Sequence, residues 1–273
     1  DGSGVANYSA KWLDGNTVTS GVIYDDGDVG ISTASPDAKL HVFDSTVADL
    51  AIFETNNPNS ANGPDVVLYR SSESPADADD LGRIAFRGRN DADQDINYAN
   101  IIGEAIDVSD GNEDGALRFN TYLTGVSTET MVLRSANVGI GTNSPAGKLH
   151  ILSSDTNNNL ILESTNAAAT TAPDLVLYRS SASAADDDYI GVIRFRGKND
   201  NGTPEDVEYG AITSQIKDST DGSEDGELAL WTMEGGTLTQ QVTLNSVGSV
   251  GIGTDAPAYT LQVAGNIGVN EYI

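Results

Sequence analysis

The sequence predicts an all-β protein built from tandem copies of one β-rich module. Its 29 glycines and its many Asn, Asp, Ser and Thr residues are typical of a chain with frequent tight turns. Between the turns lie short runs rich in β-branched and aromatic residues, and no segment keeps a helical period over three turns. One phrase recurs at residues 29, 138 and 250, which are 109 and 112 residues apart. Such spacing indicates a repeat architecture.

The recurring phrase is a connector of fourteen residues that occurs three times. The copies are VGISTASPDAKLHV (29–42), VGIGTNSPAGKLHI (138–151) and VGIGTDAPAYTLQV (250–263). In the second copy, Val138 and Ile140 can bury on one face, whereas Gly139 and Gly141 allow another backbone to approach closely. The Ser-Pro pair predicts a single helical turn before the next strand. Ser32 replaces this second glycine in the first copy, so we expect slightly different packing there.

The segments between connectors also repeat, and they predict the strands of a module. PDVVLYRSS returns 109 residues later as PDLVLYRSS, and LGRIAFRGRND returns at the same offset as IGVIRFRGKND. We expect strands at DVVLYR (65–70), RIAFRG (83–88), YANIIGEAID (98–107), ALRFNTYL (116–123) and ETMVLRS (129–135). Within RIAFRG, Ile84 and Phe86 should face one side, and Arg83 and Arg87 the other. Clusters such as DGNEDG (110–115) predict tight turns.

These repeats divide the chain into four parts. Residues 1–28 are read as the end of a preceding module, 29–137 as module one, 138–249 as module two, and 250–273 as the start of a third. Length changes between the copies fall in polar segments, where loops absorb insertions. The chain begins at Asp1 rather than Met, so we expect a processed product or a piece of a longer protein.

A module of this size has few large side chains for a core of its own. The whole chain holds 5 Phe, 2 Trp and 10 Tyr. Its short strands would also leave sheet edges open to aggregation. Winding identical chains around one axis pairs those edges and adds buried apolar area. We therefore expect β-sandwich or β-prism-like modules in an elongated fibre that is a parallel homotrimer.

Charge and composition exclude several classes of partner. With 14 Lys and Arg against 41 Asp and Glu, the net charge is −27, so nucleic acid and anionic lipid surfaces are not expected to bind. No apolar run is long enough to span a bilayer, and we expect no membrane insertion. The absence of cysteine excludes disulfides and thiolate metal sites. The acidity is typical of an extracellular or salt-exposed surface.

The two histidines occupy equivalent connector positions. His41 and His150 lie in KLHV and KLHI, but the third connector has Gln262 at this place. A metal function shared by all three connectors is therefore not retained, and we interpret these residues as half-buried positions at the start of a strand. In a trimer, three imidazoles near the axis could instead bind an ion.

Acidic residues gather in turns rather than around a groove. The clusters are DADD (with Asp77, Asp79 and Asp80), DDDY (with Asp186 to Asp188), DGNEDG and DGSEDG. Without nearby aromatic rings, they are read as solvated turns; a calcium site and a catalytic pair are the alternatives. No nucleophile motif, dinucleotide fingerprint or P-loop occurs. We predict no catalytic residue, no metal site and no cofactor.

Arg70 and Arg179 stand at equivalent places in LYRSS within a very acidic chain. We expect each to form a salt bridge with a neighbouring carboxylate, within or between chains.

The connector NVGIGTNSPAGKLHI resembles the VGIGT-x-SP-x-x-KL connector of tail fibres and related virion appendages of tailed bacteriophages, including marine and cyanobacterial phages. The module between connectors resembles the β-rich unit of those fibres. The resemblance implies a homotrimeric appendage on the virion that contacts other tail or baseplate proteins. It also implies attachment to a host cell-surface glycan or protein, through residues that the sequence does not assign.

Two other functions stay open at this point. A glycan depolymerase tailspike would need a groove with paired carboxylates and stacked aromatic rings, and the only tryptophans, Trp12 and Trp231, lie in different modules. A fibrous bacterial surface adhesin could carry the same connector. We expect a structural and adhesive fibre that is not an enzyme.

Overall fold

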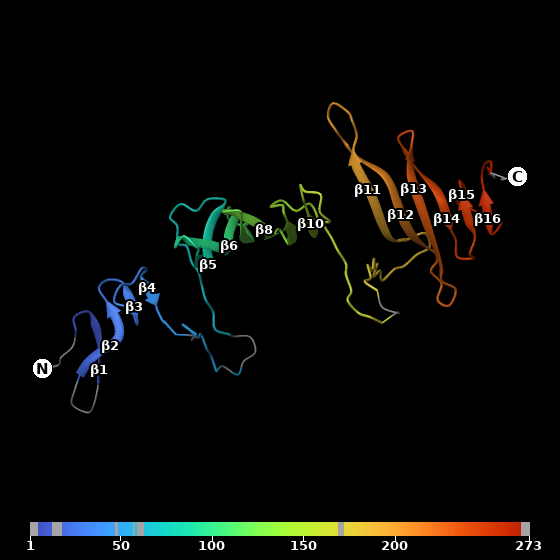
Figure 1. Ribbon diagram of the computed structural model, residues 1–273. Coiled ribbons are helices and arrows are strands. Elements are labelled where there is room, and N and C mark those ends of the chain that lie inside the picture. Colours follow the sequence, from blue (N-terminus) through green and yellow to red (C-terminus); the bar gives the residue numbers. More distant parts are fainter. Residues whose placement is uncertain are drawn as a thin grey trace. The chain divides into compact units, whose positions relative to one another are not determined.

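The computed structural model describes residues 5–12, 18–46, 49–56, 58, 63–168 and 172–268. Within these residues the chain contains strands and no helix, arranged as three sheets in tandem (Figure 1). The predicted all-β class with tandem β-rich modules is confirmed. The chain divides into two compact units, Asp1–Asn159 and Leu160–Ile273. Among the described residues, no helix long and apolar enough to cross a bilayer occurs.

The first sheet has four strands in sequential order. They are β1 (Tyr8–Trp12), β2 (Val18–Asp25), β3 (Val29–Ile31) and β4 (Leu40–Val42). The first three pair antiparallel, and β4 joins β3 in parallel.

The second sheet has six strands, also in sequential order. They are β5 (Asp79–Arg89), β6 (Asp95–Asp107), β7 (Asp114–Leu123), β8 (Val126–Arg134), β9 (Asn137–Ile140) and β10 (Leu149–Ile151). Neighbours from β5 to β9 pair antiparallel, so β5 to β8 form a meander joined by the predicted turns.

The third sheet repeats the second. Its strands are β11 (Tyr189–Lys198), β12 (Asp206–Asp218), β13 (Asp225–Glu234), β14 (Thr237–Leu244), β15 (Val250–Ile252) and β16 (Leu261–Val263). The antiparallel pairing and the final parallel pair are the same as in the second sheet.

Each connector supplies the parallel pair that ends a sheet. In the second connector, Val138 pairs with Leu149 and Ile140 with Ile151, while Val138 also pairs with Leu133 of β8. The connector strands are thus hydrogen-bonded to the strands that precede them in the chain. The module boundaries given above stay predictions.

Four of the five predicted strands of module one are present, as β5, β6, β7 and β8. The strand predicted at 65–70 is wrong, because this segment is extended but pairs with no strand in the described chain. Its β-branched residues favour an extended backbone, but a ladder also needs a neighbouring strand.

The helical turn predicted after the Ser-Pro pair is also wrong. Residues 35–39 and the matching residues of the second connector form bends. The Thr142 hydroxyl accepts a hydrogen bond from the Ser144 N–H (3.3 Å), and His150 Nδ1 accepts one from the Ala146 N–H (3.3 Å). Side-chain acceptors therefore take the N–H groups and hold a loop in place of a helical turn.

The small buried core lies on one face of each six-stranded sheet, partly beneath the connector loop. Val132 is 1% exposed and Thr243 is fully buried. A Cβ placed on Gly139 would lie 2.2 Å from the Thr142 carbonyl oxygen, so the loop crosses directly over this glycine. Gly141, with φ +70°, approaches the Leu152 carbonyl oxygen equally closely. The predicted close backbone approach at both glycines is confirmed.

Candidate functional site

One face of the second sheet carries a continuous row of apolar side chains across all six strands. The row follows the strand register and consists of Ile84, Ile101, Phe119, Met131, Ile140 and Ile151. A parallel row on the same face runs from Gly82 through Leu117, Leu133 and Val138 to Leu149. Ile84 and Phe86 lie two residues apart on this side, as predicted. We call this surface the apolar face.

The third sheet has an apolar face at the same register. Its row consists of Ile193, Ile212, Leu230, Val242, Ile252 and Val263. All six positions match the first row in register, and all remain apolar. The apolar residues of successive strands therefore line up as one continuous surface, and this surface occurs in both six-stranded sheets.

The apolar faces are largely open to solvent in the single chain. Phe86 is 54% exposed and Phe195 is 55% exposed, and their neighbours Ile84 and Ile193 are exposed as well. A sheet with one apolar face is stable only when that face packs against another layer. Exposed apolar patches of this extent mark interaction surfaces.

Two extended segments add to this exposed apolar surface. They precede β5 and β11 and contain the repeated LYRSS motif. Tyr69 and Tyr178 are each 82% exposed, and the valines before them are exposed too. The segments are nevertheless anchored, because the Leu68 side chain lies against Gly82 and the Leu177 side chain against Gly191.

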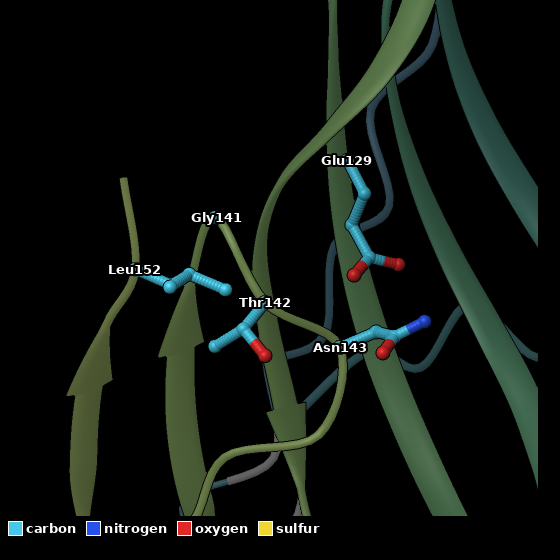
Figure 2. A pocket seen from close by; sticks show the side chains of 5 residues that line it. All are labelled: Glu129, Gly141, Thr142, Asn143 and Leu152. Atoms are coloured by element: carbon cyan, nitrogen blue, oxygen red, sulfur yellow. The ribbon is translucent and has the colours of Figure 1, made fainter. Parts of the chain in front are cut away.

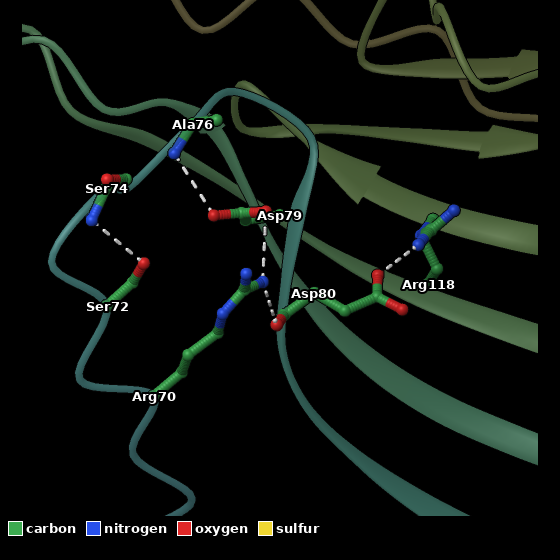
Figure 3. Close-up of polar contacts among 7 residues, drawn as sticks. All are labelled: Arg70, Ser72, Ser74, Ala76, Asp79, Asp80 and Arg118. Carbon is green, nitrogen blue, oxygen red and sulfur yellow. Dashed lines mark hydrogen bonds and ion pairs between the residues drawn. The ribbon is translucent and has the colours of Figure 1, made fainter.

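The two repeated arginines clamp these segments to the residues where the sheets begin, and Figure 3 shows the first of these clamps, at Arg70. Arg70 Nη1 lies 3.0 Å from Asp79 Oδ1 and donates to the Asp80 carbonyl oxygen at 3.1 Å. Arg179 makes the same two contacts, with Asp188 Oδ2 and with the Tyr189 carbonyl oxygen, both at 3.0 Å. The predicted salt bridges are confirmed, and both lie within the chain.

The histidine positions have a structural role in the connector loops. His41 Nδ1 accepts a hydrogen bond from the Asp37 N–H (3.2 Å), and His150 makes the same contact with Ala146. Gln262 Oε1 accepts from the Ala258 N–H (2.6 Å) at the matching place. The presence of Gln in place of His in the third connector could have predicted this role from the sequence. Both side chains offer an acceptor to the backbone N–H of the residue four positions earlier.

Ser32 shares the backbone conformation of its glycine counterparts. Its φ is +61°, against +70° at Gly141 and Gly253. The Ser32 N–H donates to the Val22 carbonyl oxygen (2.9 Å), and the Gly253 N–H donates to that of Gln241 (2.8 Å). The different packing expected at Ser32 is thus not seen in its backbone.

A shallow hollow lies beside the second connector (Figure 2). It is lined by Glu129, Gly141, Thr142, Asn143 and Leu152 and has a volume of about 380 Å³. Figure 2 shows Glu129 on its long strand facing the connector loop that carries Thr142 and Asn143. One carboxylate beside an amide does not form the pair that glycoside hydrolysis uses.

The acidic clusters hold turns in place through backbone and ionic contacts. Asp77 Oδ1 accepts from the Val108 N–H (3.0 Å), and Asp186 Oδ1 accepts from the Ser219 N–H (2.8 Å). Asp80 forms an ion pair with Arg118 at 2.7 Å, and Asp187 is paired with Lys217. In the described part of the chain, no group of three or more His, Asp or Glu side chains is placed to hold a metal ion.

Two equivalent turn carboxylates have shifted pKa values. The Ser109 N–H donates to Asp107 Oδ1 (2.8 Å), and the Thr220 N–H donates to Asp218 Oδ1 (2.8 Å). These backbone bonds, with the neighbouring hydroxyls, lower the pKa of each aspartate below its ordinary value. Both pKa shifts arise from hydrogen bonds within the turns, and they identify no acid–base pair.

Comparison with known proteins shows the fold. The chain is similar to the carboxy-terminal domain of the bacteriophage T5 L-shaped tail fibre, with 13% identity and a TM-score of 0.56 over 82% of this chain and 99% of that one. It is equally similar to the same domain solved with its intramolecular chaperone domain, at 14% identity and a TM-score of 0.56 over 82% of this chain and 68% of that one. No family model matches the chain, and no curated protein does.

Proposed function

We propose that this chain is a non-enzymatic, structural and adhesive segment of a homotrimeric virion fibre from a tailed bacteriophage. The observation that carries the proposal is the open apolar face, which recurs in the second and third sheets at one register. The likeness of the fold to a phage tail fibre domain supports the same class of protein.

Three chains arranged around one axis bury the apolar faces. Each apolar face then packs against the same face of two other copies and encloses a core on the side where the single sheet has none. Cyclic symmetry along the axis keeps the chains parallel, as a fibre attached at one end requires. Of the two forms expected from the sequence, a β-sandwich or a β-prism-like module, this arrangement corresponds to the β-prism.

The extended segments before β5 and β11 complete this assembly. Their exposed residues, such as Tyr69 and Tyr178, have no strand beside them within the described chain. A neighbouring copy supplies both apolar contact and a strand edge. The Arg70 and Arg179 clamps fix where each segment leaves its own sheet.

The biological setting follows from this role. The fibre belongs on the outside of the virion, joined to other tail or baseplate proteins, and it reaches a glycan or protein on the host surface. The net charge of −27 supports a solvated extracellular surface and disfavours nucleic acid.

The mass of the folded protein in solution tests the proposal. Sedimentation of the chain should give three times 28.5 kDa at micromolar concentration. A stable folded monomer or dimer would contradict the trimer. Incubation with host surface polysaccharide tests the enzymatic alternative, because a depolymerase releases new reducing ends and a structural fibre does not.

A further inference from the structure

We propose that the face of the third sheet opposite its apolar face binds a neutral carbohydrate across Trp231. The inference rests on the proposed attachment role and assigns to it a site and a ligand class. Trp231 of β13 stands at the centre of a register row that also contains Arg194, Ala211 and Gln240.

A hollow adjoins the indole on the side toward β11 and β12. It has a volume of about 180 Å³, and Arg194, Glu208, Ala211 and Thr213 help to line it. Ala211 is 4% exposed, so a small side chain forms the floor beside a large aromatic one. Such a step leaves room for a flat ring against the indole.

A second hollow adjoins Trp231 on the side toward the connector. It has a volume of about 360 Å³, and Gln240, Thr254 and Asp255 are among its lining residues. The first volume lies below the range of small-molecule pockets, which begins at about 300 Å³, and the second lies near the lower end of that range. The surface therefore fits one or two sugar rings of a polymer rather than an enclosed ligand.

The indole is fixed before any ligand arrives. Trp231 Nε1 donates to Thr213 Oγ1 at 2.9 Å, and Thr213 is buried. Arg194 Nη1 donates to both carboxylate oxygens of Glu208 at 2.9 Å. An immobilised side chain loses little entropy on binding.

The chemistry of these groups selects a carbohydrate. A pyranose has an apolar face that packs on an aromatic ring, and hydroxyl groups that both donate and accept hydrogen bonds. Arg194 offers donors and Glu208 offers acceptors at the edge of the hollow. The net charge of −27 disfavours anionic ligands, including phosphorylated and uronic sugars.

Comparison of the two repeats indicates that the residues of this site are not required for folding of the sheet. The corresponding row of the second sheet consists of Ala85, Asn100, Asn120 and Glu129. All four positions differ from the third sheet, although the apolar faces keep their character. The module therefore forms its sheet without a tryptophan at this place.

Direct binding tests the inference. The trimeric chain is applied to a printed array of neutral and acidic bacterial surface oligosaccharides. Each glycan that is retained is then titrated into the Trp12→Phe variant, in which Trp231 is the single tryptophan. We expect retention of neutral members and a change in indole fluorescence. Trp231→Asn, which installs the residue of the second sheet, should weaken binding at least about tenfold, as expected for lost aromatic stacking.

Two further variants control for folding. Arg194→Ala, again the residue of the second sheet, should weaken binding while the melting temperature stays unchanged, and Asn120→Ala should leave binding unchanged. Retention of no glycan, or unchanged affinity in both Trp231→Asn and Arg194→Ala, would overturn the site. A trimer that binds no glycan contradicts this inference alone, whereas a monomer that binds one contradicts the trimeric fibre alone.

Discussion

Leu68 lies directly on Gly82, and a Cβ added to that glycine would come within 2.6 Å of the Leu68 Cβ. Leu177 and Gly191 repeat the contact at 2.8 Å. An extended segment without a strand partner in the described chain is thus held on the apolar face by one leucine over one glycine. The neighbouring Arg70 clamp acts at the same place.

Replacing this glycine should release the segment. Gly82→Val should displace Leu68 at a cost of about 1–3 kcal/mol, as overpacking does elsewhere. Tryptic cleavage after Arg70, followed by mass spectrometry, should become at least about fivefold faster. Gly103→Ala is the matched control, because Gly103 pairs with Gly82 but its added Cβ meets nothing within 4 Å. Equal cleavage rates in the two variants would contradict the contact.

The connector loop should be destabilised by substitution of one of its glycines, Gly139, and should tolerate substitution of another, Gly147. Gly139→Ala places a methyl group against the Thr142 carbonyl oxygen, which belongs to the backbone and cannot rotate away. We expect a loss of about 1–3 kcal/mol in the free energy of unfolding, measured by denaturant titration. Gly147→Ala, in the same loop but with open space around it, should lose much less. A similar loss in both variants would argue against the crossing of the loop over Gly139.

The connector histidine should be replaceable by glutamine but not by valine. Gln262 already accepts the equivalent backbone hydrogen bond in the third connector. His150→Gln should therefore change the melting temperature little. His150→Val leaves the Ala146 N–H without its acceptor, at a cost of about 0.5–1.5 kcal/mol. A stability of His150→Val equal to that of the parent protein would mean that water replaces the bond without loss.

Local alternation was sufficient to predict β5 to β8 and their turns, because each strand is followed by a partner that the chain supplies. The segment at 65–70 has the same composition but no partner in its own sheet, and composition alone does not show this. The Trp231 row was also not predicted. Its face depends on register across four strands, and bulges between Phe195 and Arg196 and between Leu230 and Trp231 shift the register of those strands.

The turn aspartates should titrate at lower pH than free aspartate. The backbone N–H of Ser109 is the largest contribution to the lowered pKa of Asp107, and the Ser109 hydroxyl is the second. Carboxyl NMR titration should therefore find the Asp107 pKa still below its ordinary value in Ser109→Ala, though less so than in the parent protein. Because the bond favours the charged form, its stabilisation is present above about pH 3.8 and is lost as pH falls through the lower folded-state pKa. A normal Asp107 pKa in Ser109→Ala would assign the shift to the hydroxyl instead.

The apolar face should carry the assembly, and two adjacent residues of β5 provide a matched test. Ile84 lies on the apolar face, whereas Ala85 lies on the opposite face, at the position where the third sheet has Arg194. Ile84→Arg would place a charge without a partner in the core of the proposed trimer, where an unpaired buried charge is strongly disfavoured. We expect this variant to lose the trimer in sedimentation.

Ala85→Arg adds the same side chain to the solvent side of the same strand. It reproduces the residue of the third sheet and should sediment as the trimer, with an unchanged melting temperature. Loss of the trimer in both variants would indicate that β5 tolerates no arginine, and retention in both would show that the apolar face is not the contact between chains. Only the split result, with Ile84→Arg dissociated and Ala85→Arg intact, assigns assembly to one face of the sheet.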